Sequence, residues 1–256
     1  MDAALPHPAT QSGTAGLSSA ATLRYGLMGF ALAFVALPLY VLLPNYYAVQ
    51  FGLPLATLGG MLLGARLLDA LVDPLLGRGV NTLLAGSAGR TLAWGAAAAV
   101  ALGVGFAGLW FPLWTQGDAL LLNLAASLVL TYLAFSALTI GHQSWGALLG
   151  GDALQRARIV AWREGLGLAG VLVASVAGTL WDMQWSVALL WLALALAWWG
   201  WRSGPRPASA GFEDPTPAAP AAPQGALLLP FANPAFRALF AVFMLNGIAS
   251  AVPASL

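Results

Sequence analysis

Apolar residues are concentrated in seven long segments, separated by shorter stretches that contain polar residues, glycine or proline. The segments cover residues 23–48, 55–78, 91–111, 119–147, 158–180, 184–201 and 235–256. A helix needs about 20 mainly apolar residues to cross about 30 Å of hydrocarbon, and each segment is close to that length or longer. The pattern predicts seven membrane-spanning helices, the first of them bent at Pro38 and Pro44 because proline lacks a backbone donor.

Composition supports an all-α, polytopic membrane helix bundle. Of the 256 residues, 60% are hydrophobic and 7% are charged, whereas soluble domains contain about 25% charged residues. The net charge of +1 gives no reason to expect a nucleic-acid partner. The absence of cysteine excludes disulfides, thiolate metal sites and cysteine nucleophiles.

Two segments have the composition of solvated chain rather than of a membrane span. Residues 1–21 are mostly small and polar, without the basic and apolar regions of a signal peptide, and we predict a disordered cytoplasmic tail. Residues 203–234 are rich in proline and alanine, which favours a cytoplasmic linker. A six-helix bundle over 22–202, a linker and a further helix at 235–256 suggest a transporter of two six-helix halves, so we expect a remaining C-terminal bundle beyond a truncated end.

Arginine indicates the orientation, because basic residues are retained in cytoplasmic loops. All ten basic residues are arginine, and only Arg66 falls well inside a predicted span. With the N-terminus in the cytoplasm, the others all fall on the cytoplasmic side: Arg24, Arg78, Arg90, Arg156, Arg158, Arg163, Arg202, Arg206 and Arg237. The external loops then carry only Asp118 and Asp182. We expect an integral protein of a bacterial inner membrane with a cytoplasmic N-terminus.

Three charges interrupt the second apolar segment: Arg66, Asp69 and Asp73. A charge at the centre of a bilayer costs roughly 2.5 to 3.5 kcal/mol on insertion scales, so three charges on one span need partners or a function. At 100° per residue, the i, i+3, i+7 spacing keeps all three side chains within an arc of about 60°. Arg66 can pair with Asp69 on this face, which would leave Asp73 the less compensated carboxylate.

This face predicts a cation site. An uncompensated carboxylate can bind a cation or hold a proton. Pro74 cannot donate to the carbonyl of Ala70, and hard cations prefer carboxylate and carbonyl oxygens. The alternative is a purely structural network that locks helices together, although such a pair would need one acid and this face carries two.

These residues resemble a known family. Arg66, Asp69, Asp73 and Pro74 fit the pattern R-x-x-D-x-x-x-D-P of the glycoside-pentoside-hexuronide:cation symporters, the melibiose permease-like branch of the major facilitator superfamily. The sequence around Trp145 and the later Arg156-to-Arg163 segment are similar to that family's W/Y-x-A-L and R-x-R-x-x-x-x-R. The resemblance implies that Asp69 and Asp73 bind the coupling cation.

The chain departs from this family at its sugar-binding acids, since Ala33 and Gly141 stand at those positions. Candidates for substrate contact are His142, Gln143 and Trp145. His142 could relay a proton, donate to a substrate, or be a neutral side chain bonded across helices. The resemblance implies that Trp145 stacks on substrate, and a membrane-interface anchor is the alternative.

The loop that follows the predicted second helix also departs from the superfamily pattern G-x-x-x-D-R-x-G-R. The chain has Gly77, Arg78 and Asn81, followed by Gly89 and Arg90. Gating contacts are therefore expected to differ.

Arg156, Arg163 and Glu164 follow the fourth predicted span. We interpret them as cytoplasmic anchors, with a role of Arg163 and Glu164 in gating as the alternative.

Two stripes of small residues at i, i+4, i+8 predict close helix packing. One consists of Ala56, Gly60 and Gly64, and the other consists of Gly170, Ala174 and Gly178.

The sequence favours a secondary transporter in which Na+ or H+ binds Asp69 and Asp73 and drives a small polar solute, such as a sugar, by alternating access. A non-transporting sensor or scaffold of the same fold is the alternative. A membrane enzyme with two catalytic acids is disfavoured, because intramembrane aspartyl proteases take their acids from two helices and the motifs of lipid phosphotransferases are absent. We expect no cofactor beyond the coupling ion; the partners are the solute, the cation and the lipid bilayer.

Overall fold

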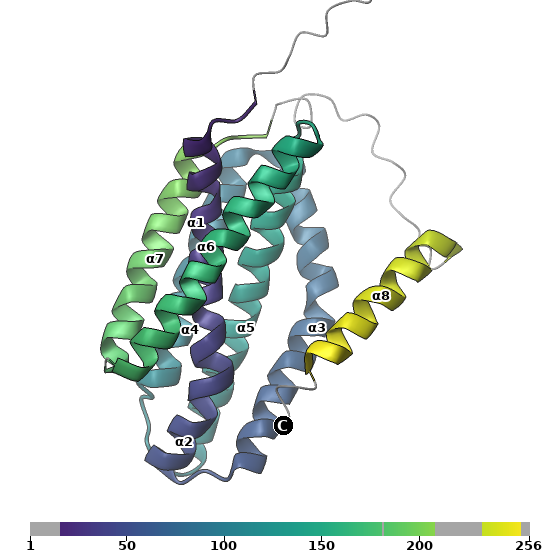
Figure 1. The fold of residues 1–256 in the computed structure, drawn as a ribbon. Coiled ribbons are helices and arrows are strands. Elements are labelled where there is room, and N and C mark those ends of the chain that lie inside the picture. Colours follow the sequence, from purple (N-terminus) through teal and green to yellow (C-terminus); the bar gives the residue numbers. More distant parts are fainter. Residues whose placement is uncertain (1–15, 181, 208–231, 252–256) are drawn as a thin grey trace, which may run out of the picture. The chain divides into compact units, whose positions relative to one another are not determined.

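A computed structural model describes residues 16–180, 182–207 and 232–251, and these residues form helices joined by short connections, with no strand among them. The helices, labelled in Figure 1, are α1 (Ser19–Leu37), a π-helical segment (Pro38–Leu42), α2 (Leu43–Phe51), α3 (Leu55–Gly86), α4 (Ala88–Trp110), α5 (Gly117–Leu148), α6 (Ala153–Leu180), α7 (Met183–Ser203) and α8 (Pro234–Ala251). The chain divides into one unit with α1 to α7 and a second unit with α8.

The predicted all-α membrane bundle is confirmed. Within the described residues, six helices are long and apolar enough to cross a membrane, and the first of these is the continuous helical stretch Ser19–Phe51. All six fall on the first six predicted segments. The seventh segment is helical as α8, which is not among the six, and its residues 252–256 lie outside the described part of the chain.

The first helix is interrupted where proline was expected to bend it. A wider π-helical turn occupies Pro38–Leu42, and the α-helix resumes at Leu43. Pro38 removes the amide donor that would bond the Phe34 carbonyl in a regular helix. The Leu43 amide donates to the Pro38 carbonyl five residues earlier, which is the wider turn of a π-helix. The second part ends at Gly52, whose φ of 68° is the left-handed conformation that glycine adopts without strain.

The predicted loop after the second span is wrong, because α3 continues through it to Gly86. Val80 and Leu84, four residues apart, are buried and give these last turns an apolar face. The chain then turns at Ser87, whose Oγ accepts a hydrogen bond from the Arg90 amide at 3.2 Å and starts α4.

Helix α6, which corresponds to the fifth predicted span, also begins earlier than predicted, at Ala153 rather than near residue 158. The Asp152 carboxylate accepts a hydrogen bond from the Gln155 amide at 2.7 Å, which satisfies one of the free donors of the first turn. This cap allows the polar start of α6 to be helical.

Within the seven-helix unit, α1 packs against both α6 and α7, while α4 packs against α5 and α7. The third helix packs mainly against α5, as Figure 1 shows. The core between these helices is apolar and aromatic, with Phe34, Phe106 and Leu128 almost completely buried. The third helix contributes little to this core for its length, since only Leu58, Ala65, Val80 and Leu84 are buried along its 32 residues.

The contact between α1 and α6 is unusually close. A Cβ atom added at Gly26 would lie 2.9 Å from the Trp162 carbonyl oxygen. Added Cβ atoms at Gly29 and Gly170 would overlap the carbonyl oxygens of Arg163 and Phe30. The two backbones therefore touch directly, as small residues permit in membrane helices.

Of the two predicted small-residue stripes, only the one on α6 packs as expected. Gly170 and the fully buried Ala174 face the interior, and Gly178 lies against Leu42. The stripe on α3 makes no such contact in the seven-helix unit, because no side chain or neighbouring backbone lies within 4 Å of the Cβ positions of Gly60 and Gly64. This stripe lies on one face of α3, as its spacing predicts, but α5 packs against the opposite face, which carries the carboxylates.

The start of the predicted linker and the end of the predicted tail pack on the bundle. Trp145 Nε1 donates a hydrogen bond to the Pro205 carbonyl at 3.1 Å, and the Leu17 amide donates to Gln155 Oε1 at 2.9 Å. Residues 1–15 and 208–231, which make up most of the predicted tail and linker, lie outside the described residues.

Replacement of Gly170 by alanine is expected to destabilise the protein, because the added methyl group overlaps the Phe30 backbone and α6 must move away from α1. Overpacking of this kind typically costs about 1 to 3 kcal/mol. Thermal unfolding in detergent, followed by circular dichroism, should show a lower Tm.

Gly165→Ala is the matched control on the same helix, because the Cβ position of Gly165 has no neighbour within 4 Å. An equal loss of Tm in the two variants would contradict the direct α1–α6 contact.

Candidate functional site

The three charges of α3 lie on the side of that helix that packs against α5. Asp69 and Asp73 are partly buried, one turn apart, and Arg66 at the exposed end of the group is more accessible. The neighbouring turns of α5 present Tyr132 and Ser136, which are 3% and 8% exposed. This α3–α5 contact is the centre of the candidate cation site.

Arg66 is held by tyrosine rather than by an acid. Its Nη1 donates a hydrogen bond to Tyr40 Oη at 2.6 Å, and its guanidinium carbon lies 5.2 Å from the centre of the Tyr40 ring. The Tyr132 ring lies 6.3 Å from that of Tyr40, and its hydroxyl also interacts with Arg66. The Arg66 guanidinium is thus held by a phenol oxygen and an aromatic face.

The local ion pair predicted between Arg66 and Asp69 is not formed among the described residues. Tyr40, which belongs to the π-helical segment, takes the place of Asp69 as the hydrogen-bond partner of the Arg66 guanidinium. Tyr40 is separated from Arg66 by 26 residues, and the helical spacing of α3 alone gave no sign of this competitor.

Each carboxyl group retains an oxygen without a partner. Ser136 of α5 is a near neighbour of the Asp69 side chain. Oδ1 of Asp69 and Oδ1 of Asp73 are both buried and accept no hydrogen bond from any described group. A buried acceptor without a donor costs roughly 1 to 3 kcal/mol, and more when it is charged.

This arrangement can accept a proton or a monovalent cation. A bound proton removes the charge, and a bound cation supplies the missing electrostatic partner. The described residues contain no group of three or more His, Asp or Glu side chains placed to bind one metal ion. Two carboxylates, supplemented by hydroxyl and carbonyl oxygens, suit Na+ or H+ better than a tightly held transition metal.

His142 joins α1 and α5 in a reciprocal pair with Tyr25. The Tyr25 hydroxyl donates to the His142 carbonyl at 2.9 Å, and His142 Nε2 lies 2.9 Å from the Tyr25 carbonyl, which can only accept. The two rings are stacked with centroids 4.0 Å apart. At 1% exposure, His142 has the geometry of a side chain bonded across helices, one of the three predicted alternatives.

Trp145 is fully buried and packs edge-on to Trp201, with ring centroids 5.8 Å apart. Its nitrogen donates to the Pro205 carbonyl. Stacking on a solute would require these contacts to open, so substrate contact by Trp145 stays a prediction that this conformation does not support.

The other predicted residues come together between α5 and α6. Gln143, Arg156 and Arg163 line a pocket of about 260 Å³ whose wall also includes Tyr25 of α1. The Arg163 guanidinium forms an ion pair with the exposed Glu164 carboxylate. Gln143 was predicted to contact substrate and the arginines to anchor the loop, whereas the fold puts all three in one pocket.

Tyr40, Tyr132 and Ser136 are the site residues that the sequence interpretation missed. Tyr132, Ser136, Thr139 and Gln143 recur at helical spacing along α5, and this polar stripe could have been recognised. Tyr40 carries no comparable signal.

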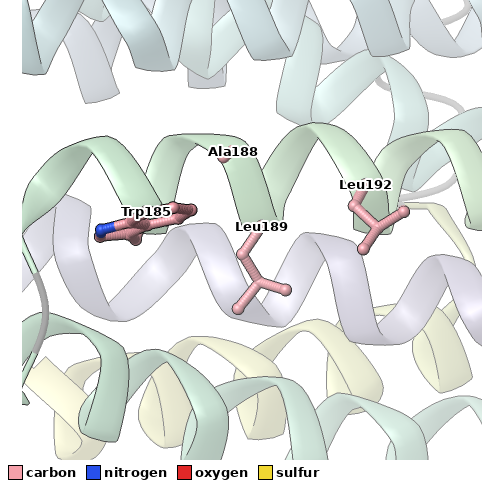
Figure 2. Close-up of a pocket in the computed structure, with 4 residues that line it drawn as sticks. All are labelled: Trp185, Ala188, Leu189 and Leu192. Atoms are coloured by element: carbon pink, nitrogen blue, oxygen red, sulfur yellow. The ribbon is translucent and has the colours of Figure 1, made fainter.

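A larger pocket of about 480 Å³ lies along α7 and is unrelated to these polar groups. Figure 2 shows Trp185, Ala188, Leu189 and Leu192, which contribute to its lining. These side chains are almost entirely apolar, as expected for a lipid-facing surface.

Comparison with known proteins gives a family. The model of the family described as "MFS/sugar transport protein" matches residues 22–256. No curated protein matches the chain. The family and the membrane bundle point to transport rather than to catalysis. Since the match extends from the first helix to the last residue, the chain belongs to the MFS/sugar transport family of the major facilitator superfamily.

Proposed function

We propose that this protein is a cation-coupled secondary transporter that moves a small polar solute, such as a sugar, by alternating access. In this proposal Na+ or H+ binds at Asp69 and Asp73. The observation that carries it is the pair of buried carboxyl oxygens, one on each aspartate, that have no hydrogen-bond donor among the described residues.

Coupling follows from the electrostatics of these two groups. Because Arg66 is bonded to Tyr40, its charge is shared with an aromatic partner and does not directly satisfy either carboxylate. Two uncompensated charges resist transfer into a closed and dry intermediate, whereas the protonated or cation-loaded pair passes through it more easily. A ligand shifts such an equilibrium by its difference in affinity for the two states.

Helix packing at residues 33 and 141 supports a solute site that does not use the pair of sugar-binding acids of the melibiose permease-like symporters. Gly141 packs against Trp94, and an added Cβ atom would lie only 2.5 Å from Trp94 Cζ3. Ala33 lies close to Gly167, in the α1–α6 contact. An acid at either position would disturb the helix packing, so the solute would be bound by other groups. Membership of that branch remains part of the proposal.

The second candidate function is a non-transporting sensor or scaffold. It is favoured by the same absence of the family's acids at positions 33 and 141. Such a protein could retain cation binding at Asp69 and Asp73 without moving a solute.

The cation site predicts a sodium-dependent or proton-dependent gain in stability. A ligand at 100 times its Kd stabilises the folded state by about 2.7 kcal/mol. For a sodium site, the Tm of the purified protein should rise when choline chloride is replaced by sodium chloride at constant ionic strength. Asp69→Asn and Asp73→Asn should lose most of this rise, because each removes a charged ligand.

Asp118→Asn is the matched control, since Asp118 lies at the exposed start of α5. For a proton site, sodium should have no effect, and wild-type protein in liposomes should instead take up solute with protons in a way that both variants lose. Unchanged sodium stabilisation and unchanged cation-driven uptake in both variants would disprove the proposed site. Cation binding without uptake of any tested sugar would favour the sensor.

We also propose that the N-terminus lies in the cytoplasm. The described arginines of the unit with α1 to α7, other than Arg66, then lie toward the cytoplasmic side, while Asp118 and Asp182 begin α5 and α7 on the outer side. The absence of native cysteine allows a direct test, because any introduced cysteine is the single reactive thiol.

Asp118→Cys in intact cells should react with a membrane-impermeant maleimide, because the residue is exposed and expected to face outward. Ala153→Cys, at the start of α6, should react only after the cells are permeabilised. The opposite labelling pattern would reverse the proposed orientation.

A further inference from the structure

The pocket between α5 and α6 has a chemical character that neither the cation site nor the fold requires. It has a volume of about 260 Å³, and its described lining includes two arginines and a glutamine but no acid. Gly146 and Ala147 of α5 and Tyr25 of α1 also line it, and the Tyr25 hydroxyl packs directly against Gly146. The pocket thus combines a mainly apolar surface with two cationic side chains on one wall.

The two arginines lie on one stripe of α6. Arg156 and Arg163 are seven residues apart, two helical turns, with Ile159 and Val160 between them on the same wall. Their Cα atoms are separated by about 10.5 Å along the helix axis. Both are long, flexible side chains, so their guanidinium groups can converge on one small ligand.

Donor capacity remains after the internal contacts of these side chains are counted. Arg163 uses Nε and Nη2 on the Glu164 carboxylate, which leaves other N–H groups of its five available. No hydrogen bond or ion pair ties the Arg156 guanidinium to another described group, although its backbone amide belongs to α6. Gln143 is exposed and adds an amide donor.

We propose that this pocket binds an anionic group, a phosphate or a carboxylate, held by Arg156 and Arg163 with Gln143 as an additional donor. Guanidinium groups match the planar or tetrahedral oxygens of such anions and form charge-assisted hydrogen bonds with them. The anion is carried either by a soluble molecule or by the headgroup of an anionic phospholipid. Guanidinium groups bind phosphate and carboxylate oxygens in either setting, and basic pockets between membrane helices bind lipid headgroups. The proposal is independent of cation coupling at Asp69 and Asp73.

Substitution of Glu164 is expected to change the anion affinity in the opposite direction from substitution of the arginines. Its carboxylate is a neighbour that competes with the anion for Arg163. Removal of that charge should strengthen anion binding, whereas removal of either arginine should weaken it. A merely structural role of the ion pair would not produce this reversal.

The test uses the purified chain with inorganic phosphate as the soluble probe. The Tm is measured in neutral detergent while phosphate replaces chloride at constant sodium and constant ionic strength. Phosphate should raise the Tm of the wild type. Arg156→Gln and Arg163→Gln should each weaken the apparent affinity roughly tenfold, as expected for the loss of charge-assisted hydrogen bonds. Glu164→Gln should strengthen it, and Arg78→Gln on α3 is the matched control.

A second experiment decides whether the bound anion is a soluble molecule or a lipid headgroup. Nanodiscs of phosphatidylcholine with and without phosphatidylglycerol are compared, and the bound phosphatidylglycerol is counted by native mass spectrometry. A response to phosphate assigns a soluble anion, and an arginine-dependent retention of phosphatidylglycerol alone assigns a headgroup. The proposal is overturned if neither probe distinguishes the arginine variants from Arg78→Gln.

Failure of the arginine variants to fold would appear as loss of helicity in circular dichroism. In that case Arg156→Lys and Arg163→Lys, which keep the charge but not the planar donor set, replace them and should show intermediate affinity. Asp69→Asn and Asp73→Asn should leave the phosphate response unchanged, so failure of the cation proposal and failure of the anion proposal can be distinguished.

Discussion

The direct contact between the α1 and α6 backbones is the constraint on which the rest of the bundle depends. Gly29 lies against the Arg163 carbonyl, and Gly170 lies against the Phe30 carbonyl, so neither position has room for a side chain. Lipid is as apolar as leucine, and membrane helices therefore associate through close packing rather than through the hydrophobic effect. The same contact fixes the rotation of α6 and thereby brings Arg156 and Arg163 to the pocket beside α5.

The fifth helix serves both polar regions. One of its faces presents Tyr132 and Ser136 to α3, where the two aspartates lie, and the Gln143 turn contributes to the arginine-lined pocket. Between them, His142 and Tyr25 bond α5 to α1 through two reciprocal hydrogen bonds. Acidic and basic groups are thus separated by a rigid helix contact, which lets each keep its charge available for a ligand rather than pair with the other.

Sequence patterns were most informative where the bilayer restricts the chain. The helical class and the first six spans follow from segment length, because backbone polar groups must be satisfied within the membrane. The Arg66, Asp69 and Asp73 face follows from helical periodicity alone. Predictions failed after the second predicted span, where α3 continues, and at the start of α6. There the buried Val80 and Leu84 and the capping Asp152 decide whether polar chain remains helical.

The membrane class, the six spans of the bundle, the shared face of the charges and the small-residue stripe of α6 could all be predicted from the amino-acid sequence, since all of these depend on local spacing. Which groups meet across helices is set by the fold. It paired Arg66 with Tyr40 rather than Asp69, buried Trp145 against Trp201, and put Gln143 with Arg156 and Arg163. These contacts join different helices, and their geometry depends on helix rotation and on the π-helical turn at Pro38, which no periodicity within one segment specifies.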